Sequence, residues 1–111
     1  KKNLQVVQTA MERVTQRRWN GTAKTAFDGA PYSSAGKTGT VQLRKTEEDE
    51  DGNVKKSSGK LNDNAVYVGY APSDVPEIAI SVVTENGGHG GESAAPVARK
   101  VLDAYFAKNK R

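Results

Sequence analysis

Four consecutive residues of this 111-residue chain could bind an anionic ligand: Lys37, Thr38, Gly39 and Thr40. The lysine cation and the threonine hydroxyls can hold a carboxylate through charge-assisted hydrogen bonds. Gly39 has no side chain, so a second backbone could approach it closely. The backbone N–H of Thr40 could face a developing oxyanion. This 37–40 segment therefore predicts a site for the carboxyl end of a peptide.

That chemistry requires the 37–40 segment to lie on an edge strand, whose free N–H and C=O groups can pair with an extended peptide. The alternating run Val41-Gln42-Leu43 predicts such a strand over about 35–45. A phosphate-binding loop is disfavoured, because six residues rather than four separate Gly29 from Gly36 and a strand replaces the required helix.

Two helices and two further strands are predicted around this strand. Residues 65–71 alternate, and residues 77–85 form a nearly continuous β-branched run typical of a central strand covered on both faces. A helix begins at Glu92 or Ser93 and continues to about residue 107. An N-terminal helix over about 4–17, facing the core, is indicated by apolar residues at helical spacing: Leu4, Val7, Met11 and Val14.

The expected fold class follows from the order helix, three strands, helix. Short connections make the sheet antiparallel, so we expect an α+β fold: an antiparallel three-stranded sheet with flanking N- and C-terminal helices. Residues 1–111 form one domain, with a mobile charged loop at about 46–62. A calcium loop is disfavoured there, because Gly52 follows Asp49 too closely and no Glu closes the frame.

The amino-acid composition argues against three further classes of function: membrane spanning, nucleic-acid binding and metal binding. Charged residues make up 27% of the chain and hydrophobic residues 35%, as in ordinary soluble domains, and no run is apolar enough to span a bilayer. The net charge is +4, but the basic residues are not interleaved with aromatic residues as they are in a nucleic-acid-binding site. With no cysteine and a single histidine, His89, which we expect in an exposed loop, no metal site can be assembled.

A serine nucleophile is not expected in this chain. Lys-Thr-Gly is one of three motifs of the serine enzymes that react with penicillin, together with Ser-x-x-Lys and Ser-x-Asn. Ser34 and Ser57 each precede a lysine by three residues, but one stands before a strand and the other in the charged loop. Neither can place serine and lysine one helical turn apart, and no Ser-x-Asn triplet exists.

Three blocks, residues 35–40, 68–72 and 85–103, occur in the order and spacing of one enzyme family. With residues 11–15 and 21–23, they make the chain resemble the C-terminal part of a class B penicillin-binding protein transpeptidase domain. The elongation-specific type is the most similar. The resemblance implies a fragment of the β-lactamase/transpeptidase-like fold, supplying three of its five strands, with the Lys37 strand at the edge that faces the cleft.

The family implies a periplasmic D-Ala-D-Ala transpeptidase, anchored in the inner membrane by a segment outside this sequence. It cross-links peptidoglycan stem peptides, needs no cofactor, and is acylated by β-lactams on its serine. By resemblance, Lys37 organises the active-site charge and hydrogen bonds. Thr38 and Thr40 bind the terminal carboxylate beside Gly39, and the Thr40 N–H completes the oxyanion hole. Because the serine is missing, we expect this chain to be inactive alone.

Two further expectations remain open. A non-enzymatic peptide-binding module could use the same edge strand. In addition, the apolar 77–85 strand would pair with an N-terminal strand of the longer domain, and if left open its edge should associate with a second copy of the chain.

Overall fold

In a computed structural model of the chain, the described residues are 1–42, 47–48, 54–55 and 63–108. The elements are, in order, α1 (Lys2–Val14), the 3₁₀ turn η1 (Arg17–Trp19), β1 (Ala35–Val41), β2 (Glu47–Glu48), β3 (Val54–Lys55), β4 (Asn64–Ala71), β5 (Ile78–Thr84) and α2 (Ala94–Lys108). The main sheet has the order β1-β4-β5 and is antiparallel throughout. The predicted α+β class is confirmed.

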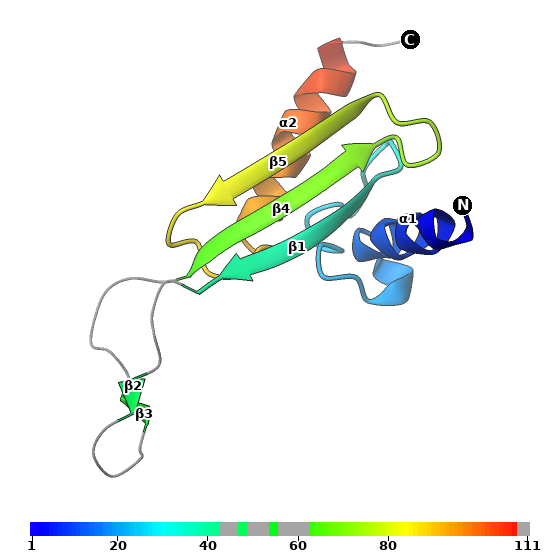
Figure 1. Ribbon diagram of the computed structural model, residues 1–111. Helices are drawn as coiled ribbons and strands as arrows, with labels where there is room; N and C mark the ends of the chain where they lie inside the picture. The colour runs from blue at the N-terminus through cyan, green and yellow to red at the C-terminus, as the bar shows by residue number, and fades with distance from the viewer. Residues whose placement is uncertain (43–46, 49–53, 56–62, 109–111) are drawn as a thin grey trace.

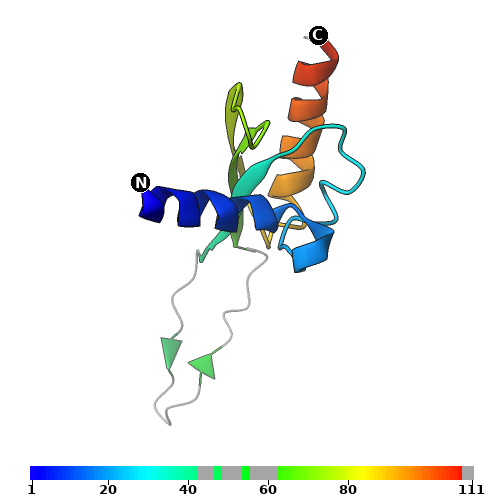
Figure 2. The ribbon, with the colours of Figure 1, turned by 90° about the vertical axis from the view of Figure 1, so that its right-hand side faces the viewer.

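Helix α2 covers one face of the sheet, behind the strands in Figure 1 and to one side of them in Figure 2. Its stripe of small residues lets the helix approach the strands closely, and Leu102 fills the space that remains. The buried residues of α2 are Ala94, Ala95, Ala98 and Leu102. They share one core with residues of β4, whose side chains alternate between a buried and a more exposed face.

Tyr67 is the largest side chain in this core and is completely buried. It stacks on Phe27 with ring centroids 5.7 Å apart. Its hydroxyl lies under the paired residues Gly36 and Gly69, and a Cβ on Gly36 would overlap that hydroxyl. Glycine at position 36 therefore makes room for the Tyr67 ring directly beneath the start of β1.

The burial predicted for the last strand is wrong, because one face of β5 packs on the core and the other is exposed. Strand β4 is central in the described sheet, and β5 lies at the edge with its residues alternately half-buried and exposed. A continuous β-branched run predicts a strand correctly but carries no information about its neighbours. Here Ile80 and Val82 pack on the core, whereas Val83 is 60% exposed on the opposite face.

The N-terminal helix is also more exposed than the sequence predicts. Helix α1 ends at Val14 rather than near residue 17, and none of its residues is buried; Leu4 is 61% exposed and Val7 53%. Only the C-terminal end reaches the core, where Val14 packs. Figure 2 shows the reason: the N-terminal part of α1 projects to the side of the sheet that α2 does not cover.

The segment 46–62 was predicted to be a mobile loop. Within it the structure describes only β2 and β3, which pair in an antiparallel ladder, Glu47 with Lys55 and Glu48 with Val54. The rest of that prediction, including most of the rejected calcium frame and Ser57, lies outside the described residues.

Candidate functional site

The 37–40 segment lies on β1, which is the edge strand that the sequence predicts. In the part of the chain that the structure describes, β1 pairs along one side with β4, from Ala35 with Tyr70 to Val41 with Asn64. Figure 1 shows its other side unpaired by any strand. This margin can accept an extended peptide as a further strand.

The pleat of β1 separates the predicted site residues into two groups. Thr38 and Thr40 stand opposite Tyr67 and Ala65, on the face toward α2, whereas Lys37 stands opposite Val68 on the other face. The Lys37 side chain is exposed, and its ammonium donates a 2.7 Å hydrogen bond to the Thr38 carbonyl oxygen. The cation and the hydroxyls can therefore act together only at the strand margin.

The Thr38 hydroxyl has a partner that the sequence analysis did not identify. It lies 2.8 Å from the hydroxyl of Thr22, which comes from the irregular connection between η1 and β1. Both groups are accessible to solvent. The only sequence signal for Thr22 was its place in the block 21–23, because contacts between distant loop and strand residues leave no periodic pattern.

The glycine-rich connection before α2 supports β1 from below. Gly90 is buried, and a Cβ there would lie 2.7 Å from the carbonyl oxygen and 2.9 Å from the nitrogen of Gly39, and would overlap the Val66 carbonyl oxygen. No side chain fits between these backbones, so the loop 87–91 fixes the height of the 37–40 segment above the core.

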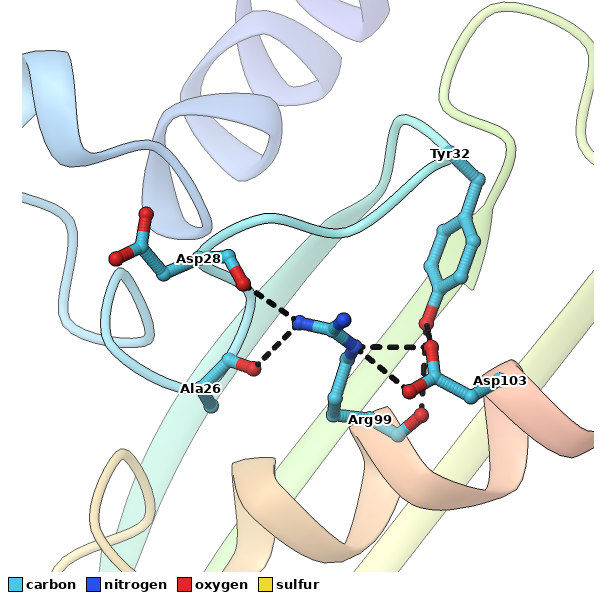
Figure 3. Close-up of polar contacts among 5 residues, drawn as sticks. All are labelled: Ala26, Asp28, Tyr32, Arg99 and Asp103. Carbon is cyan, nitrogen blue, oxygen red and sulfur yellow. Dashed lines mark hydrogen bonds and ion pairs between the residues drawn. The ribbon is translucent and has the colours of Figure 1, made fainter.

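A polar network fastens the irregular connection 20–34 to α2 (Figure 3). Arg99 donates to the carbonyl oxygens of Asp28 and Ala26, at 2.9 and 3.2 Å, and its Nε donates to both carboxylate oxygens of Asp103, at 2.8 and 3.0 Å. Tyr32 donates to Asp103 at 2.7 Å. One guanidinium thus ties two loop carbonyls to one helix, and so restrains the segment that carries Thr22.

These contacts also shift the pKa values of Tyr32 and Asp103. Burial raises the pKa of the Tyr32 hydroxyl, and its bond to Asp103 raises it further. Burial acts to raise the pKa of the Asp103 carboxyl as well, but hydrogen bonds from Tyr32 and Arg99, with the charge of Arg99, outweigh this and bring that pKa below its ordinary value. Burial likewise raises the pKa of the Tyr67 hydroxyl.

The other candidate residues form no second site. His89 is exposed in the loop before α2, as predicted. Ser34 is buried just before β1 and its carbonyl accepts a bond from the Thr15 hydroxyl, so it does not stand one helical turn from Lys37. Over the described ranges, no group of three His, Cys, Asp or Glu side chains could hold a metal ion. No helix among these residues has the length and apolar character needed to cross a membrane.

This chain is similar in sequence to a known protein family. The family model described as the penicillin-binding protein transpeptidase domain matches residues 1–103. The peptidoglycan D,D-transpeptidase MrdA of Haemophilus influenzae is 44% identical over 87 residues, which are 78% of this chain and 13% of that protein. This chain therefore spans only about an eighth of that relative's length.

Solved structures agree with that match. Pseudomonas aeruginosa PBP2, crystallised in complex with WCK 5153, superposes with a TM-score of 0.68 and 32% identity over 89% of this chain and 18% of that chain. The PBP2 of Helicobacter pylori superposes with a TM-score of 0.75 over 99% of this chain and 17% of that chain; at 22% identity it supports the fold alone.

Proposed function

This chain belongs to the penicillin-binding protein transpeptidase family, and from that premise we propose that it forms one wall of the active site of a longer serine-type D,D-transpeptidase. The longer protein would act on peptidoglycan stem peptides in the periplasm, anchored to the inner membrane. The observation that carries the proposal is the unpaired margin of β1, on which the 37–40 segment lies.

The proposed role of this wall is to hold the carboxyl end of the peptide or of a β-lactam. A carboxylate at the β1 margin would accept hydrogen bonds from the Thr38 and Thr40 hydroxyls and would be attracted by Lys37. The 2.7 Å contact from the Lys37 ammonium to the Thr38 carbonyl supports this, because it brings the ammonium beside the residue whose hydroxyl would bind the carboxylate. Gly39 keeps the approach open for a second backbone.

The Thr40 N–H is proposed as an oxyanion donor. In an antiparallel pair, a residue that exchanges both bonds with its partner directs both backbone groups toward it, and its neighbours direct theirs away. Gly39 N and the Val66 carbonyl oxygen both lie close to the position of a Cβ on Gly90, which supports Gly39 as the residue that faces β4. Alternation then directs the Thr38 and Thr40 backbone groups toward the margin, where a substrate carbonyl would lie.

The proposed reaction needs a nucleophile that this sequence lacks. A serine of the longer protein would attack the carbonyl of the terminal D-Ala-D-Ala bond and release D-alanine, and an amine would then displace the serine from the acyl-enzyme. A β-lactam would acylate the same serine, and the leaving amide nitrogen would stay attached through the opened ring. In both reactions the 37–40 segment binds and polarises, and performs no covalent step.

Mass spectrometry after incubation with a labelled penicillin tests this proposal. We expect one adduct per molecule of the longer protein, on a serine of a Ser-x-x-Lys sequence, and no adduct on the 111-residue chain. A stoichiometric adduct on the chain alone would refute the assignment, as would a longer protein that lacks Ser-x-x-Lys and Ser-x-Asn.

We also propose that two copies of the chain associate through the edge of β5. The exposed edge position of β5 supports it, because an unpaired strand presents N–H and C=O groups to a second copy. A single monomeric species in sedimentation at high concentration would argue against it.

A further inference from the structure

The hydroxyl of Thr22 lies beside the Thr38 hydroxyl, one of the two threonine hydroxyls of the proposed carboxylate-binding wall. The two oxygens are 2.8 Å apart, a normal hydrogen-bond distance, and either could be the donor. Thr22 is exposed and belongs to a loop, whereas Thr38 lies in β1. Which of the two hydroxyls donates to the other determines whether the Thr38 proton is available to a bound anion.

Thr22 is held in place through its backbone. The Ala23 N–H donates to the Val14 carbonyl at 2.9 Å, which binds the loop to the end of α1. The Lys24 N–H donates to the Gly21 carbonyl at 3.1 Å, which closes a turn around Thr22. On the other side, a Cβ on Gly91 would overlap the Thr22 carbonyl oxygen. The loop before α2 therefore packs directly on Thr22. Because the backbone of Thr22 is fixed on both sides, its side chain is attached at a fixed position.

The direction of the hydrogen bond between the two hydroxyls determines which proton can be donated to a ligand. Each hydroxyl has one proton, and a carboxylate can only accept. If Thr38 donates to Thr22, its proton is used and cannot bind the ligand. If Thr22 donates to Thr38, the Thr38 proton is available to the carboxylate, and the Thr38 oxygen becomes a better donor because it is itself accepting a hydrogen bond.

We propose that Thr22 is a positioning residue: it donates to the Thr38 hydroxyl and so directs the Thr38 proton toward the carboxylate of the peptide or β-lactam. The inference rests on the proposed function, because it needs a carboxylate at the β1 margin. Thr22 itself does not touch the ligand. Its contribution should therefore depend on Thr38 and on the ligand's negative charge.

The test measures the second-order rate constant for acylation of the longer protein by a penicillin and by its methyl ester, which has no carboxylate. Thr22→Val removes the hydroxyl and keeps the shape. We expect the rate with the free acid to fall about five- to tenfold, as for a weakened hydrogen bond to a charged group, and the rate with the ester to change less than about twofold. Thr22→Ala should give the same result and avoids any clash.

Two matched variants complete the design. Thr22→Ser retains the donor and should restore the rate with the free acid to within about twofold. Thr22 and Thr25 both line a hollow of about 550 Å³. Thr25→Val changes an exposed threonine of this hollow and should have no effect on either rate. In a Thr38→Val background, Thr22→Val should add less than about twofold, because the group it positions is gone.

The outcomes separate this inference from the function it rests on. Equal losses with acid and ester, or no loss with Thr22→Val and Thr22→Ala, would overturn the positioning role of Thr22. If Thr38→Val and Thr40→Val both leave the preference for the free acid intact, the carboxylate-binding wall itself is wrong. A full effect of Thr22→Val in the Thr38→Val background would also overturn the inference.

Discussion

The two faces of the sheet differ sharply in how they are packed. On the α2 face, Tyr67 and Leu102 are almost completely buried. On the opposite face, Val68 is 40% exposed and Val83 60%. The candidate site lies at the strand margin where these faces meet, with the threonine side chains on the packed face and Lys37 on the open one. The packed face therefore fixes the position of β1, and the open face leaves the site accessible.

The largest expected effect comes from removing a buried side chain. Leu102→Ala should lower the free energy of unfolding by about 2–5 kcal/mol, because a cavity opens between α2 and the sheet. Val83→Ala on the open face should change it by less than about 0.5 kcal/mol. Denaturant titration of the two variants measures both values. Equal losses would mean that the two faces are covered to the same extent.

A smaller effect is expected from the network that fastens the 20–34 connection. Arg99→Leu leaves two loop carbonyls and Asp103 without this donor, and should cost about 1–3 kcal/mol. Arg17→Leu is the matched control, since the Arg17–Asp28 pair, at 3.0 Å, is 60% exposed on both sides and should contribute less than about 1 kcal/mol. If both variants lose the same amount, the loop does not depend on Arg99.

The smallest effect concerns the pH dependence of the same network. Because contacts in the folded chain lower the pKa of Asp103, its carboxylate adds stability above the ordinary carboxyl pKa of 3.8, and this stability is lost as the pH falls through the lowered value. Tyr32→Phe removes one of the bonds that lower that pKa, so Asp103 should add less stability in the variant, and the loss of that stability should be complete at a higher pH. Acid unfolding followed by circular dichroism compares the variant with the wild type. Identical profiles would contradict the assigned coupling.

Much of the fold follows from sequence patterns alone. The alternation in residues 65–71 predicts β4, and the helix predicted from Glu92 or Ser93 to about residue 107 is α2, both nearly at their observed bounds. The edge strand predicted for the 37–40 segment is β1. The family predicted from the three blocks is confirmed by the match over residues 1–103. An apolar pattern with a period of 2 or 3.6 residues predicts a strand or a helix with one buried face, and β4 and α2 each have such a face.

The errors have a common physical origin. The apolar stripe of α1 and the β-branched run of β5 each predict burial, but burial depends on which elements lie opposite, and that is set by the tertiary arrangement. The contact between Thr22 and Thr38 spans 16 residues of irregular chain and has no sequence period. The bonds from Arg99 to the Ala26 and Asp28 carbonyls likewise join residues more than 70 positions apart, and no sequence period predicts them.

A crystal structure of the longer protein acylated by a penicillin would reveal directly whether the β1 margin holds the ligand. We expect a ligand carboxylate oxygen within about 3 Å of the Thr38 and Thr40 hydroxyls, and the acyl carbonyl oxygen at a similar distance from the Thr40 nitrogen. A carboxylate bound elsewhere, or a β1 margin occupied by another strand of the protein, would contradict this expectation.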